Sequence, residues 1–128
     1  MKKLIVIAVL CLTVSQSFAA IVRSAKLDKT LRNILIDIEY SGGCKEHKFK
    51  LVPGPCFETY PLQCNAKLVD ETQDDFCEAF IFQTISIPLT QINIDLNDEY
   101  YSGAHLYITG DKDYKTKKDS EAFIILPK

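Results

Sequence analysis

Four cysteines lie close together behind an N-terminus that has the composition of a secretory signal. The four are Cys44, Cys56, Cys64 and Cys77, and a fifth, Cys11, lies within the N-terminal segment itself. Because disulfides form and persist in oxidising compartments, an even number of cysteines in an exported chain predicts a disulfide framework. The fold must therefore bring two pairs of cysteines together.

Residues 1–19 have the successive parts of a signal peptide. Lys2 and Lys3 form a basic start, residues 4–14 form an apolar run, and a short stretch of small and polar residues follows. Ser17 and Ala19 occupy the positions that signal peptidase requires, which predicts a mature chain beginning at Ala20. We therefore expect an exported protein, periplasmic or extracellular.

Two alternatives to a cleaved signal are less favourable. Lipoprotein processing at Cys11 requires a small residue before the cysteine, and Leu10 stands there. A retained membrane anchor requires ~20 apolar residues, and the apolar run is shorter than that. We expect no transmembrane segment in the mature chain.

The mature chain is mildly acidic. Without Lys2 and Lys3, 13 of the 15 basic residues remain against 17 acidic ones, a formal charge of −4. This balance argues against binding to nucleic acid, because affinity for nucleic acid depends on cationic contacts to phosphate. Residues 20–128 show no linker or repeat, and we expect one domain.

Hydrophobic and polar residues alternate along most of this domain, as they do in half-buried strands. Such runs cover residues 21–27, 33–40, 47–51, 62–68, 79–89, 104–109 and 122–126. Seven short strands with turns between them predict an all-β fold, an antiparallel, immunoglobulin-like β-sandwich stapled by disulfides. Tyr100 or Tyr101 would supply the tyrosine corner of such a sandwich.

One strand departs from simple alternation. Phe80 and Phe82 have the opposite parity to Ile85 and Ile87. A β-bulge near Gln83, or burial on both faces, would reconcile the two halves of this strand.

Residues 40–49 read Tyr-Ser-Gly-Gly-Cys-Lys-Glu-His-Lys-Phe. The segment resembles a Tyr-Ser-Gly-Gly-Cys-x-x-His-x-Phe motif of small uncharacterised bacterial secreted proteins and lipoproteins. The resemblance implies an exported bacterial protein and assigns no activity or site.

The predicted hairpin of residues 46–52 and 62–69 ranks the possible cysteine pairings. Cys44 and Cys56 lie at opposite ends of an extended segment, whose residues at ~3.3 Å each separate them far beyond the reach of a disulfide. Cys56 and Cys64 both lie near the loop end of the hairpin. Cys44 and the segment after Asp70, which contains Cys77, lie near its open end. We therefore expect Cys44 to pair with Cys77 and Cys56 with Cys64.

His47 has a structural and a metal-binding interpretation. It alternates with Phe49 and Leu51, which predicts a buried, neutral imidazole bonded to backbone near the Gly-Gly turn. Alternatively, Cys44 and His47 have Cys-x-x-His spacing and would form a metal corner, completed by Cys56 and Cys64. Export favours disulfides, so we expect no metal and no cofactor. His105 falls on the polar face of its strand.

Two acidic stretches, residues 70–75 and 111–113, gather oxygen ligands of the kind that calcium prefers. Neither keeps the order of ligands and glycine of an EF-hand loop. We interpret both stretches as solvated turns.

The sequence carries no catalytic motif. It has two histidines and lacks a Gly-x-Ser-x-Gly turn, a His-Glu-x-x-His motif and a phosphate-binding glycine loop. We expect a non-enzymatic binding or structural module whose partner is another protein. An alternative is a protease inhibitor or other cleft binder that uses the proline-flanked loop 53–61, presenting Pro55, Phe57, Glu58 and Tyr60.

Overall fold

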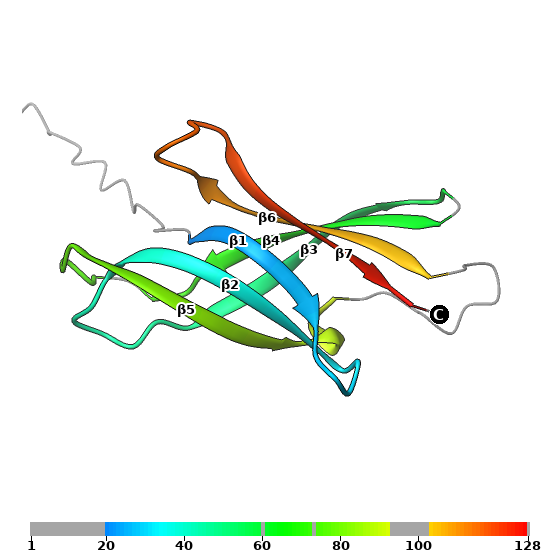
Figure 1. Cartoon of the computed structure of the whole chain (residues 1–128), viewed down its shortest axis with the longest axis horizontal. Helices are drawn as coiled ribbons and strands as arrows, with labels where there is room; N and C mark the ends of the chain where they lie inside the picture. Colours follow the sequence, from blue (N-terminus) through cyan, green and yellow to red (C-terminus); the bar gives the residue numbers. More distant parts are fainter. Residues whose placement is uncertain (1–19, 60, 73, 93–102, 128) are drawn as a thin grey trace, which may run out of the picture.

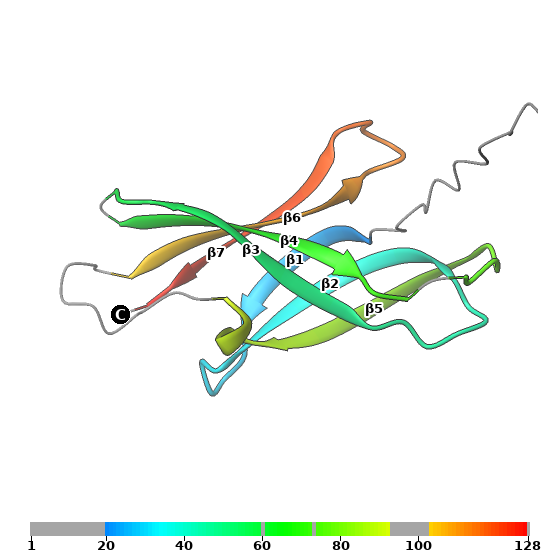
Figure 2. The same ribbon diagram turned by 180° about the vertical axis from the view of Figure 1, so that it is seen from behind.

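The computed structural model describes residues 20–59, 61–72, 74–92 and 103–127. These residues form two β-sheets that pack face to face, with their strands crossing at an angle (Figures 1 and 2). The strands are β1 (Ile21–Leu27), β2 (Asn33–Gly42), β3 (Phe49–Phe57), β4 (Leu62–Asp70), β5 (Ala79–Pro88), β6 (Ala104–Lys112) and β7 (Asp119–Leu126). A short 3₁₀ helix, η1 (Leu89–Gln91), follows β5. The all-β class and the seven strands are confirmed.

The three-stranded sheet has the order β1-β2-β5, and the four-stranded sheet has the order β3-β4-β6-β7. The core between them comes from alternate residues of each strand, because successive side chains point to opposite faces. Its fully buried members are Ile34, Ile36, Ile38, Cys64, Leu68, Leu106, Ile108 and Leu126.

Strand pairing differs from the expected antiparallel pattern at one place. The β4–β6 pair is parallel, whereas the other strand pairs of the described chain are antiparallel. In an immunoglobulin domain the fourth strand joins the first, second and fifth, whereas here β4 stays beside β3. The Cys56–Cys64 disulfide links opposed residues of β3 and β4 and so holds this hairpin together.

The Pro-Gly-Pro segment lies inside β3 and not in the connecting loop where the sequence placed it. β3 is an edge strand, and edge strands and bulges are the places in a sheet where proline is tolerated. The β3–β4 register shifts between Pro53 and Cys56, where the strand accommodates the irregular backbone.

The expected bulge near Gln83 is absent, because β5 pairs with β2 without interruption from Ala79 to Pro88. Ile81, Ile85 and Ile87 turn towards the core. Phe80 and Phe82 consequently point outwards, with 66% and 73% of their surface exposed. Burial on both faces is also wrong, and the change of parity reflects two aromatic side chains on the outer face.

Candidate functional site

A buried cluster of one histidine and two aspartates joins the ends of the two sheets. His47 precedes β3, Asp70 ends β4, and Asp75 lies in the segment between β4 and β5. The Nδ1 of His47 lies 2.5 Å from an Asp70 carboxylate oxygen, and its Nε2 lies 2.6 Å from an Asp75 oxygen. All three side chains are almost completely buried.

Both ring nitrogens of His47 face carboxylates, so the imidazole donates on both sides and carries a positive charge. Burial by itself lowers the pKa of His47 and is the largest influence, but the hydrogen bonds to Asp75 and Asp70 and the attraction of both charges outweigh it. The net result is a raised pKa. The pKa of Asp75 is lowered, chiefly by the hydrogen bond from His47 and then by bonds from backbone N–H groups.

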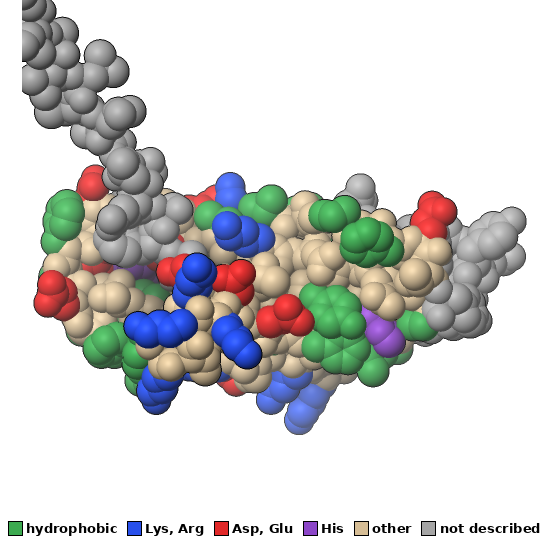
Figure 3. Space-filling model, turned by 90° about the horizontal axis from the view of Figure 1, so that it is seen from above, with side chains coloured by type: hydrophobic (Ala, Val, Ile, Leu, Met, Phe, Trp, Pro, Cys, Tyr) green, Lys and Arg blue, Asp and Glu red, His purple; other side chains and the backbone are tan. Residues whose placement is uncertain are grey.

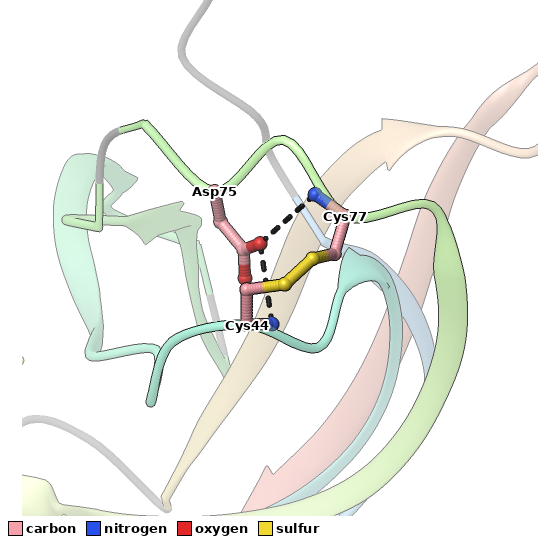
Figure 4. Close-up of side chains that lie close together, drawn as sticks. All are labelled: Cys44, Asp75 and Cys77. Atoms are coloured by element: carbon pink, nitrogen blue, oxygen red, sulfur yellow. Dashed lines mark hydrogen bonds between the residues drawn. A yellow bond between two sulfur atoms is a disulfide. The ribbon is translucent and has the colours of Figure 1, made fainter.

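Asp75 also organises the loop around the first disulfide. Its carboxylate accepts hydrogen bonds from the backbone N–H groups of Gly43, Cys44, Lys45 and Cys77 at 3.1 to 3.3 Å. Figure 4 shows two of these bonds, to Cys44 and Cys77, beside the disulfide that links those two residues. One carboxylate therefore fixes the chain on both sides of this disulfide.

The glycine pair of the 40–49 segment leaves room for the cluster. A Cβ on Gly42 would lie 2.6 Å from the Asp75 carboxylate and 2.8 Å from His47 Nε2, closer than such atoms approach in proteins. Gly43 has φ of +116°, a conformation that residues with a side chain rarely adopt. The Gly-Gly-Cys-x-x-His spacing thus provides a turn that admits a buried imidazolium.

The sequence correctly predicted that His47 is buried, but the prediction of a neutral ring bonded to backbone is wrong. The partners are carboxylates that follow His47 by 23 and 28 residues, which strand parity does not reveal. The acidic residues of the stretch 70–75 were the sequence feature that could have indicated carboxylate partners for His47. Asp70 and Asp75 of that stretch are internal ion-pair partners rather than parts of a solvated turn.

Nothing in this arrangement activates a nucleophile. Within the described residues, His47 forms hydrogen bonds only to the two carboxylates, and its nearest aromatic neighbour is Tyr40, with ring centroids 4.5 Å apart. A histidine that serves as a general base needs one nitrogen available to the reacting group. Both nitrogens are occupied here.

The alternative interpretation, a metal site that includes Cys44 and His47, is not supported, because the cysteines form disulfides. Donor atoms of Cys44, Asp75 and Cys77 lie within 4.8 Å of one another, but the two sulfurs are bonded to each other (Figure 4). Cys56 and Cys64 are likewise bonded to each other. Since a thiolate is the form of cysteine that binds a metal, these cysteines offer no ligand while they are oxidised. The two pairings are those that the hairpin geometry predicted.

A second polar network lies on the outer face of the three-stranded sheet, and the sequence did not predict it. Glu39, 2% exposed, accepts two hydrogen bonds from the Arg23 guanidinium and one from the Tyr114 hydroxyl. Arg23 also contacts Asp113 at 2.5 Å. Asp113 and Tyr114 come from the β6–β7 turn, which therefore folds against the outer face of the other sheet. Asp113, in the second acidic stretch, has a protein partner.

The four-stranded sheet carries exposed apolar side chains on its outer face. Ile125 is 62% exposed and Phe123 44% exposed, and both lie on β7 opposite His105 and Tyr107 of β6. The Phe123 ring lies 5.1 Å from that of His105 and 5.0 Å from that of Tyr107, measured between centroids. Figure 3 shows hydrophobic side chains gathered beside a histidine on this face. We call these four residues the β6–β7 patch.

The predicted loop site is described only in part. Pro55 and Phe57 lie within β3 next to the Cys56–Cys64 disulfide, and Phe57 is 55% exposed. Glu58 is also exposed. Tyr60 lies outside the described residues, as do the signal segment and the two candidates for the tyrosine corner.

Comparison with protein-family models, with curated proteins and with solved structures gives no match. Among the described residues, no helix has the length and apolar character needed to cross a membrane.

Proposed function

We propose that this chain is an exported, non-catalytic binding module that recognises another protein through the β6–β7 patch. The observation that supports the proposal most is the exposure of Phe123 and Ile125, 44% and 62%, beside Tyr107 and His105 on one open sheet face. Contiguous exposed apolar side chains on a protein surface commonly mark a site of interaction.

The buried charged groups support a binding role rather than catalysis. His47 is held between two carboxylates, and Glu39 is held by Arg23 and Tyr114. No buried side-chain nitrogen or oxygen of the described residues lacks a hydrogen-bond partner. These groups stabilise the fold, and the exposed side chains remain for recognition.

The patch has the composition of a protein interface. Aromatic residues are enriched at such interfaces, where they provide large contact areas, and tyrosine and histidine add polar atoms for hydrogen bonds. Lysine and arginine are absent from its four residues, which fits a protein partner better than a polyanion. The two disulfides and the signal-like N-terminus support export.

The test is affinity capture from the envelope fraction of the producing cell with purified, oxidised protein. The double variant Phe123→Ser, Ile125→Ser should lose the captured protein, and Val52→Ser should keep it, since Val52 is a comparably exposed residue on β3. Unchanged melting temperatures would show that all three proteins are folded. Equal capture by the double variant and the wild type would refute the assignment to this patch.

A second candidate is insertion of the disulfide-closed end of the β3–β4 hairpin into a protease cleft. Phe57, 55% exposed beside the Cys56–Cys64 disulfide, favours it, because a preorganised loop loses little entropy on binding. Stoichiometric inhibition of a secreted protease that Phe57→Ala abolishes would establish this function. Absence of inhibition across serine, cysteine and metalloproteases would exclude it.

A further inference from the structure

The outer edge of β5 is an unpaired strand edge. β5 is the last strand of the three-stranded sheet and pairs only with β2 among the described strands. The Leu89 N–H donates to the Arg32 carbonyl at 2.9 Å, one residue beyond the last ladder pair, so the backbone of Leu89 faces β2. Backbone groups of successive strand residues point in opposite directions. The uninterrupted register therefore directs the backbone groups of Phe80, Phe82, Thr84 and Ser86 away from β2.

Sheet proteins prevent strand addition with charged side chains, prolines and bulges, among other features, and on β5 the one such feature of these three is Pro88, its last residue. The segment from Ala79 to Ile87 has no charged residue, no proline and no shift in its register with β2. Two of the outward residues, Phe80 and Phe82, are large, apolar and mostly exposed. The β5 edge therefore has unpaired backbone groups and, from Ala79 to Ile87, no charge, proline or bulge that would oppose pairing with another strand.

The other sheet edges in the described chain are protected. β3 carries Pro53 and Pro55 and a register shift. β1 and β7 contact each other, and the Val22 N–H donates to the Ser120 hydroxyl at 2.9 Å. Among the edge strands of the described chain, β5 is therefore the best candidate for pairing with another strand.

We infer that β5 pairs antiparallel with β5 of a second copy of this chain and so joins two three-stranded sheets into one of six strands. The inference concerns the opposite sheet from the β6–β7 patch and does not rest on the proposed function. A two-fold axis beside Gln83 places Phe82 opposite Thr84 and Phe80 opposite Ser86 of the copy. This register pairs the whole length of the open edge.

Charge complementarity favours a second copy over a foreign strand. Glu78 stands immediately before β5, and Arg32 lies at the far end of β5, where its carbonyl accepts the Leu89 N–H. Both residues are exposed, and neither side chain has an ion-pair partner among the described residues. Antiparallel pairing brings Glu78 of each copy to the end that carries Arg32 of the other. The strand between them is uncharged, so no like charges oppose each other across the axis.

Sedimentation equilibrium of the purified, oxidised protein tests the pairing. We expect twice the mass of one chain, and we expect Phe82→Lys to weaken the dimer by about tenfold or more, because lysine on an edge opposes pairing. Val52→Lys, which introduces a lysine on the edge strand of the other sheet, should leave the dimer intact. A monomeric wild type would overturn the inference, as would a dimer that Phe82→Lys leaves unchanged. A monomer that instead binds an added extended peptide along β5 would identify a foreign strand as the occupant.

Cysteine cross-linking tests the register. Residues that face each other in a pair without hydrogen bonds have Cα atoms about 4.5 Å apart, which suits a disulfide. Gln83→Cys should therefore link two chains on mild oxidation. Ser86→Cys on the same strand should not, because it lies roughly 20 Å from its own copy at ~3.3 Å per residue. Equal linking by both variants, or linking by Ser86→Cys alone, would contradict the proposed axis.

Discussion

His47 is one of the residues that connect the two sheets. The Cys44–Cys77 disulfide extends the β2–β5 pair, in which Gly42 faces Ala79, and Asp70 is the last residue of β4. The His47 ring bridges Asp70 on one side and Asp75 on the other, and Asp75 fixes the loop that contains the disulfide. A single imidazolium therefore links the end of one sheet to the end of the other.

His47→Ala should destabilise the protein by about 3 kcal/mol, because it leaves two buried carboxylates without their common cation. Urea unfolding followed by circular dichroism measures the change. His105→Ala, which removes the only other histidine from a half-exposed position, should cost no more than ~0.5 kcal/mol. Equal losses for the two variants would show that the buried ion pairs contribute little.

The stability contributed by this cluster should depend on pH in two directions. The pKa of His47 is raised above its ordinary value of 6.5, so its contribution is complete below 6.5 and is lost as the pH rises through the raised value. The pKa of Asp75 is lowered from 3.8, so its contribution is complete above 3.8 and is lost as the pH falls through the lowered value. The contribution is therefore largest between these two ordinary values.

The difference in melting temperature between the wild type and His47→Gln measures this dependence. We expect it to be largest near pH 5 and to shrink as the pH is raised towards about pH 9, because glutamine does not titrate. A difference that grows over this range would mean that the ring is neutral in the folded protein.

At the scale of elements, each disulfide lies within or next to a strand pair of one sheet, Cys56–Cys64 between β3 and β4 and Cys44–Cys77 beside the end of the β2–β5 pair. Cys56 and Cys64 face each other in the β3–β4 register, and their sequence separation is 8, against 33 for Cys44 and Cys77. In the loop-entropy model, the stabilisation grows with the length of the closed loop. The larger ring also encloses the segment that Asp75 organises.

Replacing Cys44 and Cys77 together by serine should therefore cost about 4 kcal/mol, and replacing Cys56 and Cys64 about 2.5 kcal/mol. Denaturant unfolding of the two double variants checks the order. A greater loss from the β3–β4 pair would mean that the hairpin, and not the His47 loop, limits stability.

Alternation of side chains was sufficient to predict the seven strands and most of the core, because burial on one face imposes a period of two. It could not predict that Phe80 and Phe82 face outwards, since a pattern of apolar residues is the same whether they meet the core or a partner. It also missed the parallel β4–β6 pair, which depends on which sheet each strand joins. The ion pairs of His47 and Glu39 depend on contacts between distant segments, which no local pattern encodes.

At the scale of the whole molecule, several charged groups lie in the interior while several large apolar side chains lie on the surface. The buried charges of His47, Asp70, Asp75 and Glu39 all meet protein partners. Exposed apolar side chains lie on the outer faces of the two sheets, on β5 and on β7, and further ones lie elsewhere on the surface, at Leu31, Val52, Phe57, Phe76 and Tyr114. Within the described residues, this arrangement fits the proposed binding module, in which the buried charges stabilise the fold and exposed side chains contact a partner.

If the buried charges only stabilise the fold, the His47 ring must carry a positive charge in the folded protein. Nitrogen-15 NMR of the ring, recorded from about pH 5 to about pH 8, tests it directly, because an exposed histidine titrates in this range. Because the pKa of His47 is raised, we expect both ring nitrogens to be protonated at pH 6.5, where a free imidazole is half neutral, with ring N–H protons that exchange slowly. A ring that loses its proton at or below the ordinary pKa of 6.5 would contradict the account, because His47 would then be a neutral base at physiological pH.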